Sequence, residues 1–489
     1  MPGTFTLKAQ AEKLPNSIWR AVAMSFLLQV LAIAFLHAYR IRTADNHFGF
    51  GWEMGCVGRA IASGRGFSDP YCAGTGPTAW EPPLYPYLIG AVFKLFGIYT
   101  AASAWVLLSI NSLFSALTCI PIYLIARKVF DDRVARWSAW TWALLPYTWY
   151  WSIHWIWDTT ITPFVLSLIF LVSLVLAGDG YAKGGQAEDG DSDPFVPEGQ
   201  RDDRVPAPFV PEGRRESSPA FQRRVQSANH SRPGGTADLP RWTLFGALWG
   251  FGALMNPSML SFLPFCGLWI WYRRHKRALP SFAGVVVASA VFFVTLSPWL
   301  VRNYNAFGRF VFIRDDFGEQ FRLGNGPGAD GILMAYLQPN LNQEELQRFR
   351  SMGELPYAEQ RKREAFQFIR ENPSHFAAIS LRRFVYYWAG VPKRSDSAFL
   401  AALKNLPFLI SSILAIWGLV RALRQRRPGA GLFALLVLSY PTVYYFVFPH
   451  ARYRHPIEPE LIILVVFLIA GWRFGTPTQE PLAVAHKVR

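Results

Sequence analysis

The sequence is short of charged residues. Only 17% of its 489 residues are Asp, Glu, Lys or Arg, below the share of about 25% that is usual in soluble domains. Hydrophobic residues reach 51% and gather in long runs, such as 164–177 and 461–470. A soluble fold could not bury so much apolar surface, whereas apolar runs approaching about 20 residues can cross a bilayer as helices. The composition excludes a soluble globular enzyme and predicts an all-α polytopic membrane protein.

Cysteine is scarce as well, with four residues and no CxxC or Cys/His cluster. This scarcity excludes a framework of several disulfides and a compact zinc site. Cys119 and Cys266 lie inside apolar runs, where we expect them to be packing residues. Cys56 and Cys72 share one polar loop. A disulfide between them is one of two alternatives, because spacing alone does not establish a pairing.

Acidic residues are outnumbered, with 33 Asp and Glu against 49 Lys and Arg and a net charge of +16. Such an excess can indicate nucleic-acid binding, but here the basic residues stand mainly beside apolar runs, as in 273–277 and 424–427. Short cytoplasmic loops of membrane proteins are enriched in Lys and Arg. We therefore interpret the basic residues as topology anchors and expect no nucleic-acid partner.

Ten apolar segments can be marked as membrane spans. The first is followed by Arg40 and Arg42 and has no small-residue cleavage site, so we interpret it as an uncleaved span. With the N-terminus inside, the short basic loops fall on the cytoplasmic side, and the polar stretches 39–101 and 300–404 face outward. The predicted spans are 17–38, 102–126, 134–153, 158–177, 242–256, 258–271, 281–299, 405–421, 430–448 and 456–472.

The polar stretches divide the chain. Residues 178–241 are rich in Pro, Gly, Ser and charge, which predicts a disordered cytoplasmic loop. Residues 340–390 have helical periodicity with many charges, which predicts a small helical domain on the outer face. The expected parts are an N-terminal transmembrane module 1–177 with the first outer loop 39–101, the loop 178–241, transmembrane helices 242–299, an outer helical segment 300–404, and C-terminal transmembrane helices with a cytoplasmic tail 405–489.

The first outer loop carries acidic residues among glycines and aromatics. Irregular backbone beside a membrane usually lines a cavity, because lipid cannot satisfy its amides. Glu53 and the run GRAIASGRGF fit a short amphipathic helix, and Glu81 precedes a second helix after Pro82-Pro83. A carboxylate held there could act as a general base. The alternative is that Glu53 and Glu81 are solvated or salt-bridged loop residues.

Asp158 stands among tryptophans at the outward end of the fourth predicted span. An acidic residue at a membrane boundary is costly unless it is paired or functional. We expect it to line the active cavity. The alternative is that its charge interacts with the dipole of the helix that it precedes.

Several arginines lie at the predicted outer water interface: Arg302 after the seventh span, and Arg452 and Arg454 before the tenth. Guanidinium groups suit phosphate oxygens because they donate paired hydrogen bonds and stay charged. The simpler interpretation is that an arginine extends its charged end to the interface. We adopt this interpretation for Arg309 but not for Arg452 or Arg454.

Four stretches of the chain carry a family resemblance: GRAIASGRGF followed by TAWEPPLYPYL, PWLVRNY with GNGPGADG, NPSHFAAISLRRFVYYW, and ARYRHPIEPEL. On these the chain resembles bacterial membrane glycosyltransferases of the GT-C superfold, of the protein mannosyltransferase-like, lipid A aminoarabinose transferase-like, glycosyltransferase family 39-like kind. The resemblance implies transfer of a sugar from a polyprenyl phosphate donor, usually with inversion, to an envelope lipid, glycan or protein acceptor. It places the protein in a bacterial inner membrane with the site facing the periplasm. It implies no certain cofactor and leaves a divalent metal open.

The resemblance also implies roles for residues. The usual base is a carboxylate of the first outer loop, but Gly49 and Phe50 stand where relatives often carry an Asp-Glu pair. We therefore expect Glu53 as the first candidate base and Asp158 as the second, with Asp45 slightly upstream as another. Basic groups would stabilise the departing phosphate. The expected substrate-binding residues are Glu81, which replaces a basic residue or histidine of the relatives, and Arg302, Asn303, Lys393, Arg452, Tyr453, Arg454 and His455.

Two further hypotheses come from other classes. A transporter or flippase would carry intramembrane charges and helices broken at mid-depth, whereas the polar residues here gather at the outer interface. The second hypothesis is a non-catalytic scaffold with the same fold, since a fold does not prove a function. The sequence specifies neither the sugar nor the acceptor.

Overall fold

The computed structural model describes residues 14–41, 47–178, 238–393 and 397–473. Within these ranges the chain is built from helices and connecting turns, and its extended pairing amounts to one isolated bridge between Ser68 and Pro77. The predicted all-α class is confirmed. Nearly all of the predicted disordered loop 178–241 and the candidate base Asp45 lie outside the described residues.

Each of the ten predicted spans coincides with helical residues. By length and apolar composition, five stretches of the described chain are able to cross a membrane. These stretches are α2 (Asn16–Phe35), α5 (Ala101–Leu117) with α6 (Cys119–Val129), η2 (Asp158–Thr160) with α9 (Ile161–Leu176), α13 (Phe282–Phe307), and α18 (Ala398–Arg424).

Proline residues break two of the other predicted spans. The helix predicted over 134–153 is α7 (Asp132–Leu144) and α8 (Pro146–His154), with the break at Pro146. The helix predicted over 430–448 is α19 (Ala430–Ser439) and α20 (Thr442–Phe446), separated at Pro441. Proline has no N–H to continue the helical ladder, so a new helix starts at or after it.

The predicted split near Asn256-Pro257 is confirmed. There α11 (Leu239–Met255) gives way to η3 (Pro257–Ser261) and then α12 (Leu263–His275). The start of α11 lies at 239 rather than 242, inside the predicted loop. The described chain ends with α21 (Glu458–Arg473).

Small residues allow α11 and α13 to pack closely. A Cβ added at Gly246 would lie 2.3 Å from the carbonyl oxygen of Ala288, and one at Gly250 would lie 2.6 Å from Cβ of Thr295. Glycine at such positions lets helix backbones approach in a membrane. In contrast, only 22% of the most apolar stretch of α13 is buried, and 28% of that of α18. The exposed apolar faces of these helices are suited to lipid.

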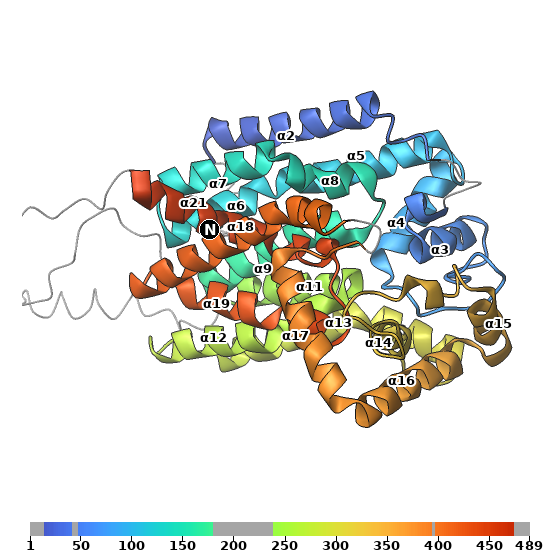
Figure 1. Cartoon of the computed structure of the whole chain (residues 1–489). Helices are drawn as coiled ribbons and strands as arrows, with labels where there is room; N and C mark the ends of the chain where they lie inside the picture. The colour runs from blue at the N-terminus through green and yellow to red at the C-terminus, as the bar shows by residue number, and fades with distance from the viewer. Residues whose placement is uncertain (1–13, 42–46, 179–237, 394–396, 474–489) are drawn as a thin grey trace, which may run out of the picture.

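The loop helices gather at one end of the bundle (Figure 1). The two short helices predicted in the first outer loop are present as α3 (Glu53–Ala62) and α4 (Leu84–Phe96). The helices predicted between 340 and 390 are present at the same end. They are α15 (Gln343–Met352), α16 (Glu354–Glu371) and α17 (Pro373–Ala389), preceded by α14 (Phe317–Gly324).

Trp80 joins the first outer loop to these later helices. Its ring centroid lies 5.3 Å from that of Phe349 on α15 and 6.3 Å from that of Tyr357 on α16. Tyr71, also from the first loop, stacks edge-on against Phe349 at 4.9 Å. All four rings are buried, so the outer helical segment and the first loop share one core.

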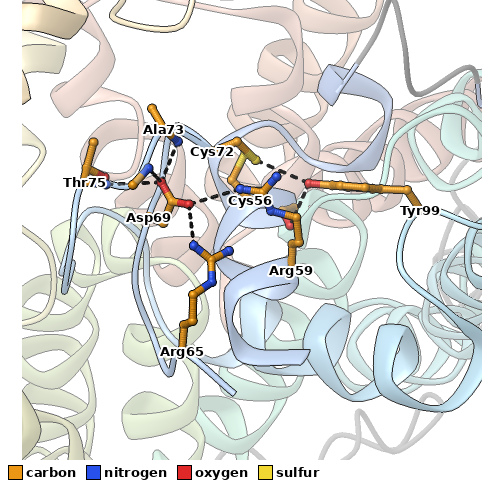
Figure 2. Close-up of a disulfide and its surroundings, with 10 residues drawn as sticks. Cys56, Arg59, Arg65, Asp69, Cys72, Ala73, Thr75 and Tyr99 are labelled. Atoms are coloured by element: carbon orange, nitrogen blue, oxygen red, sulfur yellow. Dashed lines mark hydrogen bonds and ion pairs between the residues drawn. A yellow bond between two sulfur atoms is a disulfide. The ribbon is translucent and has the colours of Figure 1, made fainter. Parts of the chain in front are cut away.

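The turn between α3 and α4 is tied together around Asp69 and a disulfide (Figure 2). Cys56 of α3 is bonded to Cys72, which decides between the two alternatives for this pair. Oδ1 of Asp69 accepts hydrogen bonds from the backbone N–H groups of Ala73 and Gly74 at 2.6 and 2.7 Å. Cys119 and Cys266 are buried thiols, as predicted.

Candidate active site

A cavity of about 440 Å³ lies between the loop helices and the ends of the spans. Its wall combines the start of α3, the turn before α4, the start of α9, the break between α11 and η3, α14, and the segment between α20 and α21. The side chains that give it chemical character are Glu53, Glu81, Asp158, Asn256, Arg314, Asp316, His450, Arg452 and Tyr453.

A turn with an unusual backbone conformation places Glu53 at this cavity. Gly51 has a φ of +88°, and an added Cβ would lie 2.5 Å from the carbonyl oxygen of Ile156. Trp52 follows with a φ of +50°, a conformation that non-glycine residues rarely adopt. Glu53 is then the first residue of α3 and is only 8% exposed. Backbone conformations of this kind cost free energy and persist where the surrounding structure holds them.

Glu53 and Glu81 influence each other electrostatically. Burial, and then repulsion from the Glu81 carboxylate, raise the pKa of Glu53 to about 8, against the attraction of Arg452 and Arg314. Burial also raises the pKa of Glu81, again opposed by Arg314 and Arg452. A carboxyl group whose pKa lies near neutrality can take up and return a proton at working pH.

Asp158 reaches the same cavity from η2, at the start of α9. It is 3% exposed, and its Oδ2 accepts a hydrogen bond of 2.9 Å from Nδ2 of Asn256. Asn256 is itself fixed, because its Oδ1 accepts from the backbone N–H of Ser258 at 3.1 Å. The break between α11 and η3 thus serves to orient a carboxylate.

Two arginines supply positive charge. The Arg452 guanidinium lies 4.4 Å from the ring centroid of Trp157, and its buried Nε has no hydrogen-bond partner within the described chain. Arg314 forms an ion pair with Asp316. Guanidinium groups bind phosphate oxygens well, and both arginines already line the cavity, so they need little reorganisation to do so.

His450 contributes a neutral group. Burial, together with repulsion from Arg452 and Lys393, lowers the pKa of His450 to about 3. Its Nδ1 accepts from the backbone N–H of Arg452 at 3.2 Å. The imidazole therefore helps to hold the segment that carries Arg452 and adds no charge near pH 7.

The segment that precedes Glu81 is held by hydrogen bonds to α16 and to the segment that precedes α14. Glu354, the first residue of α16, accepts hydrogen bonds from the Thr78 hydroxyl and, at 2.6 Å, from the backbone N–H of Ala79. The carbonyl of Ala79 accepts from the backbone N–H of Asp315 at 2.9 Å. Because Asp315 stands between Arg314 and Asp316, this bond also fixes two cavity residues against the first loop.

The structure brings together five of the predicted site residues: Glu53, Glu81, Asp158, Arg452 and Tyr453 all line the cavity. Three others lie elsewhere. Arg302 donates to the carbonyls of Thr78 and Phe67 at 2.5 Å each. Asn303 is buried, accepts a hydrogen bond of 3.0 Å from Arg302 and donates through Nδ2 to the carbonyl of Val311 at 3.4 Å. Lys393 is exposed and is not part of the cavity wall.

Arg454 and His455 lie in the helical core instead of the cavity. Arg454 forms a buried ion pair of 2.5 Å with Glu458 and donates to the hydroxyls of Ser411 and Ser412 at 2.7 Å each. His455 is fully buried, with its ring 5.6 Å from that of Trp142. Arg452 and Arg454 therefore point into different environments although they are two residues apart.

Sequence reasoning missed Arg314, Asp316, Asn256 and His450 as site residues. For Arg314 and Asp316 a signal exists, since the run IRDDFGEQ places a cluster of charges in the polar stretch that follows the seventh span. The signal for Asn256 is the Asn-Pro pair that breaks α11. His450 had no signal, because nothing in its local sequence shows that the segment folds back over the first loop.

The residues present do not form a compact metal site as placed. Glu53, Glu81 and Asp158 share the cavity, yet within the described ranges no three His, Cys, Asp or Glu side chains stand close enough together to hold an ion. We therefore derive no catalytic step through a metal.

Residues 80–182 match the model of the family described as dolichyl-phosphate-mannose-protein mannosyltransferase. The resemblance drawn from the sequence is confirmed for this segment. It includes Glu81 and Asp158, two of the cavity carboxylates. No curated protein matches the chain.

Solved structures of two proteins are similar to this chain. The oligosaccharyltransferase of Archaeoglobus fulgidus in the apo form has 14% identity and a TM-score of 0.48, covering 93% of this chain and 50% of its own. This chain thus spans about half the length of that protein, whose structure has also been solved in complex with Zn and sulfate. ArnT from Cupriavidus metallidurans bound to undecaprenyl phosphate has 12% identity and a TM-score of 0.32, covering 92% of this chain and 78% of its own.

Proposed function

We propose that this protein is an integral membrane glycosyltransferase that moves a sugar from a polyprenyl phosphate donor to an envelope lipid, glycan or protein acceptor. The observation that carries the proposal is the joining, in one cavity beside the spans, of buried carboxylates with two arginines and aromatic walls. The match of residues 80–182 to a family named for a lipid-phosphate sugar donor supports it. The sugar is a hexose or a pentose, and the cavity faces the periplasm of a bacterial inner membrane.

In the proposed reaction the acceptor is a hydroxyl or an amine. Its nucleophilic atom forms a bond to the anomeric carbon of the sugar, and the bond between that carbon and the phosphate oxygen breaks. The electron pair of the broken bond leaves with the phosphate. The Glu53 carboxylate takes the proton of the acceptor, so the products are the glycosylated acceptor, polyprenyl phosphate and a protonated Glu53.

Each cavity group has a part in this reaction. Glu53 acts as the general base, a contribution worth about 10²–10⁴ in rate. Arg452 and Arg314 stabilise the negative charge that develops on the departing phosphate. Asp158, held by Asn256, orients the sugar or the acceptor and is the second candidate base. Trp155, Trp157 and Tyr453 offer ring faces to a sugar.

The test is an assay for free polyprenyl phosphate released from a panel of polyprenyl phosphate sugars, with the full chain in nanodiscs. Glu53→Gln keeps the size of the side chain and removes the base. Glu344→Gln, on the exposed face of α15, is the matched control. We expect release by the parent and by Glu344→Gln and loss of at least about 100-fold with Glu53→Gln.

The proposal is contradicted if folded parent protein turns over no donor of the panel, which would favour a scaffold or a transporter. If the parent is active and Glu53→Gln equals it, the transferase activity stands and the base assignment is wrong. Asp158→Asn then identifies whether the second carboxylate supplies the base.

A further inference from the structure

A second hollow lies apart from the active-site cavity. It is a groove of about 890 Å³ between the turn that follows α3 and the last turns of α13. No residue lines both spaces. The separating wall is the segment around Thr78, whose carbonyl accepts from Arg302 on the groove side.

Arg302 gives this groove its charge. Its Nη1 donates to the Thr78 carbonyl and its Nη2 to the Phe67 carbonyl at 2.5 Å each, and its guanidinium lies 4.8 Å from the ring centroid of Trp299. Nη1 also donates to Oδ1 of Asn303 at 3.0 Å. These three bonds fix the group and leave two of its five N–H donors for a ligand. Within the described chain the carboxylate that acts on Arg302 is that of Glu354, which is already engaged by Thr78 and Ala79.

A second arginine adds to the excess of positive charge. Arg65 lines the groove. It shares Oδ2 of Asp69 with Arg59, at 3.1 Å from each (Figure 2). One carboxylate therefore faces two guanidinium groups, and with Arg302 the groove region carries net positive charge.

The apolar side of the groove continues along the membrane-facing surface of α13. Pro298, Val301 and Asn305 line the groove, and Val294 precedes them on the same stripe at helical spacing. Val294 is 69% exposed and Val301 is 57% exposed. On the opposite side, a Cβ added at Gly74 or Gly76 would meet no atom within 4 Å, so there is room beside the arginines for a headgroup.

We propose that this groove binds a membrane lipid with a phosphate headgroup, which Arg302 and Arg65 contact while an acyl chain lies along the Val294–Asn305 stripe of α13. A phosphate offers several acceptor oxygens to Arg302 and to Arg65, which shares its carboxylate partner Asp69 with Arg59. An acyl chain matches a stripe of exposed apolar residues at the end of a span. Neither argument depends on transferase activity, so the site is tested by binding alone.

The experiment is native mass spectrometry of the full chain in detergent micelles, titrated with phosphatidylglycerol and, separately, with diacylglycerol of the same acyl chains. The parent is expected to retain one phosphatidylglycerol more tightly than diacylglycerol. Arg302→Gln and Asn305→Asp are expected to weaken that binding by about tenfold or more. Asn305→Asp matters because it places a repelling charge in the groove and leaves the bonds of Arg302 to Thr78 and Phe67 intact.

Two matched variants control for general effects of charge. Arg309→Gln removes an exposed arginine just beyond α13, and Gln347→Glu adds an exposed acid on α15. Both should bind phosphatidylglycerol as the parent does. The proposal is overturned if Asn305→Asp binds like the parent, if the controls weaken binding equally, or if glycerol 3-phosphate displaces the lipid at the concentration at which phosphatidylglycerol does.

Discussion

Nδ2 of Asn256 donates a hydrogen bond of 2.9 Å to Oδ2 of Asp158, a residue 98 positions away in the sequence. The bond connects the break after α11 to the start of α9 and holds a buried carboxylate toward the active-site cavity. Because Asn256 stays neutral at every pH, we expect it to position the Asp158 carboxylate without adding charge to the cavity.

Asn256→Ala removes this bond and leaves the carboxylate in place. A hydrogen bond to a charged group contributes about 1.5–3 kcal/mol, so we expect kcat/KM for donor turnover to fall about 10- to 100-fold. Asn372→Ala, which removes a hydrogen bond at the end of α16, should leave turnover unchanged. Parent-like turnover of Asn256→Ala would show that Asp158 needs no such support.

The pH dependence of turnover should report Glu53. Its pKa is raised to about 8 by burial and by Glu81, and the base works only when deprotonated. We therefore expect kcat/KM to rise with pH and to level off above about 8. Glu81→Gln removes the repelling charge, so the midpoint of the rise should move to lower pH. A midpoint that does not move would mean that the two carboxyl groups are not coupled.

Gly51→Ala should disturb the turn that delivers Glu53. The new Cβ would meet the Ile156 carbonyl at 2.5 Å in a residue with φ +88°. Gly64→Ala is a matched control, because Gly64 has φ +78° but nothing lies within 4 Å of the added Cβ. Both variants carry the cost of a left-handed conformation, about 1–2 kcal/mol. We expect Gly51→Ala alone to lose most donor turnover, and equal losses would contradict the steric argument.

Reduction of the Cys56–Cys72 disulfide should destabilise the protein. The bond closes a loop with a sequence separation of 16, for which loss of the cross-link costs about 3 kcal/mol. A thermal unfolding midpoint in nanodiscs should drop when a reductant is added to the parent. The double variant Cys56→Ser with Cys72→Ser should start from the lower midpoint and not respond to the reductant, whereas Cys119→Ser should respond as the parent does.

Glu354 should make stability depend on pH. Burial, opposed by hydrogen bonds from Thr78 and Ala79, raises the pKa of Glu354 from 4.5 to about 8. The folded protein thus holds this proton more tightly than the unfolded chain. The resulting stabilisation is complete below about 4.5 and is lost as the pH rises through about 8. Glu354→Gln should show a smaller drop in unfolding midpoint between pH 5 and pH 8 than the parent, and an equal drop would contradict this assignment.

The sequence predicted the helical class and the positions of the ten apolar segments because lipid imposes length and composition on each span separately. It also located Glu53, Glu81 and Asp158, since acidic residues beside spans are rare and conspicuous. It did not locate the breaks at Pro146 and Pro441 within single predicted spans, because the apolar run continues on both sides of each proline.

The sequence could not separate Arg452 from Arg454 or Arg302. All three are arginines at the predicted interface, and their surroundings come from other parts of the chain. Arg454 is neutralised by Glu458, while Arg302 is held by carbonyls of the first loop more than two hundred positions earlier. Tertiary contacts of this kind leave no local pattern.

The cavity joins residues that lie far apart in the chain, with Glu53 and Glu81 from near the start of the described chain and Arg452 from near its end. During synthesis the first outer loop with both carboxylates is made early, whereas Arg452 follows only after α18, α19 and α20. Until then the chain presents Glu53, Glu81 and Arg314 but lacks Arg452, the second arginine of the proposed phosphate site. We therefore expect an incomplete chain that ends before Arg452 to lack the complete proposed site.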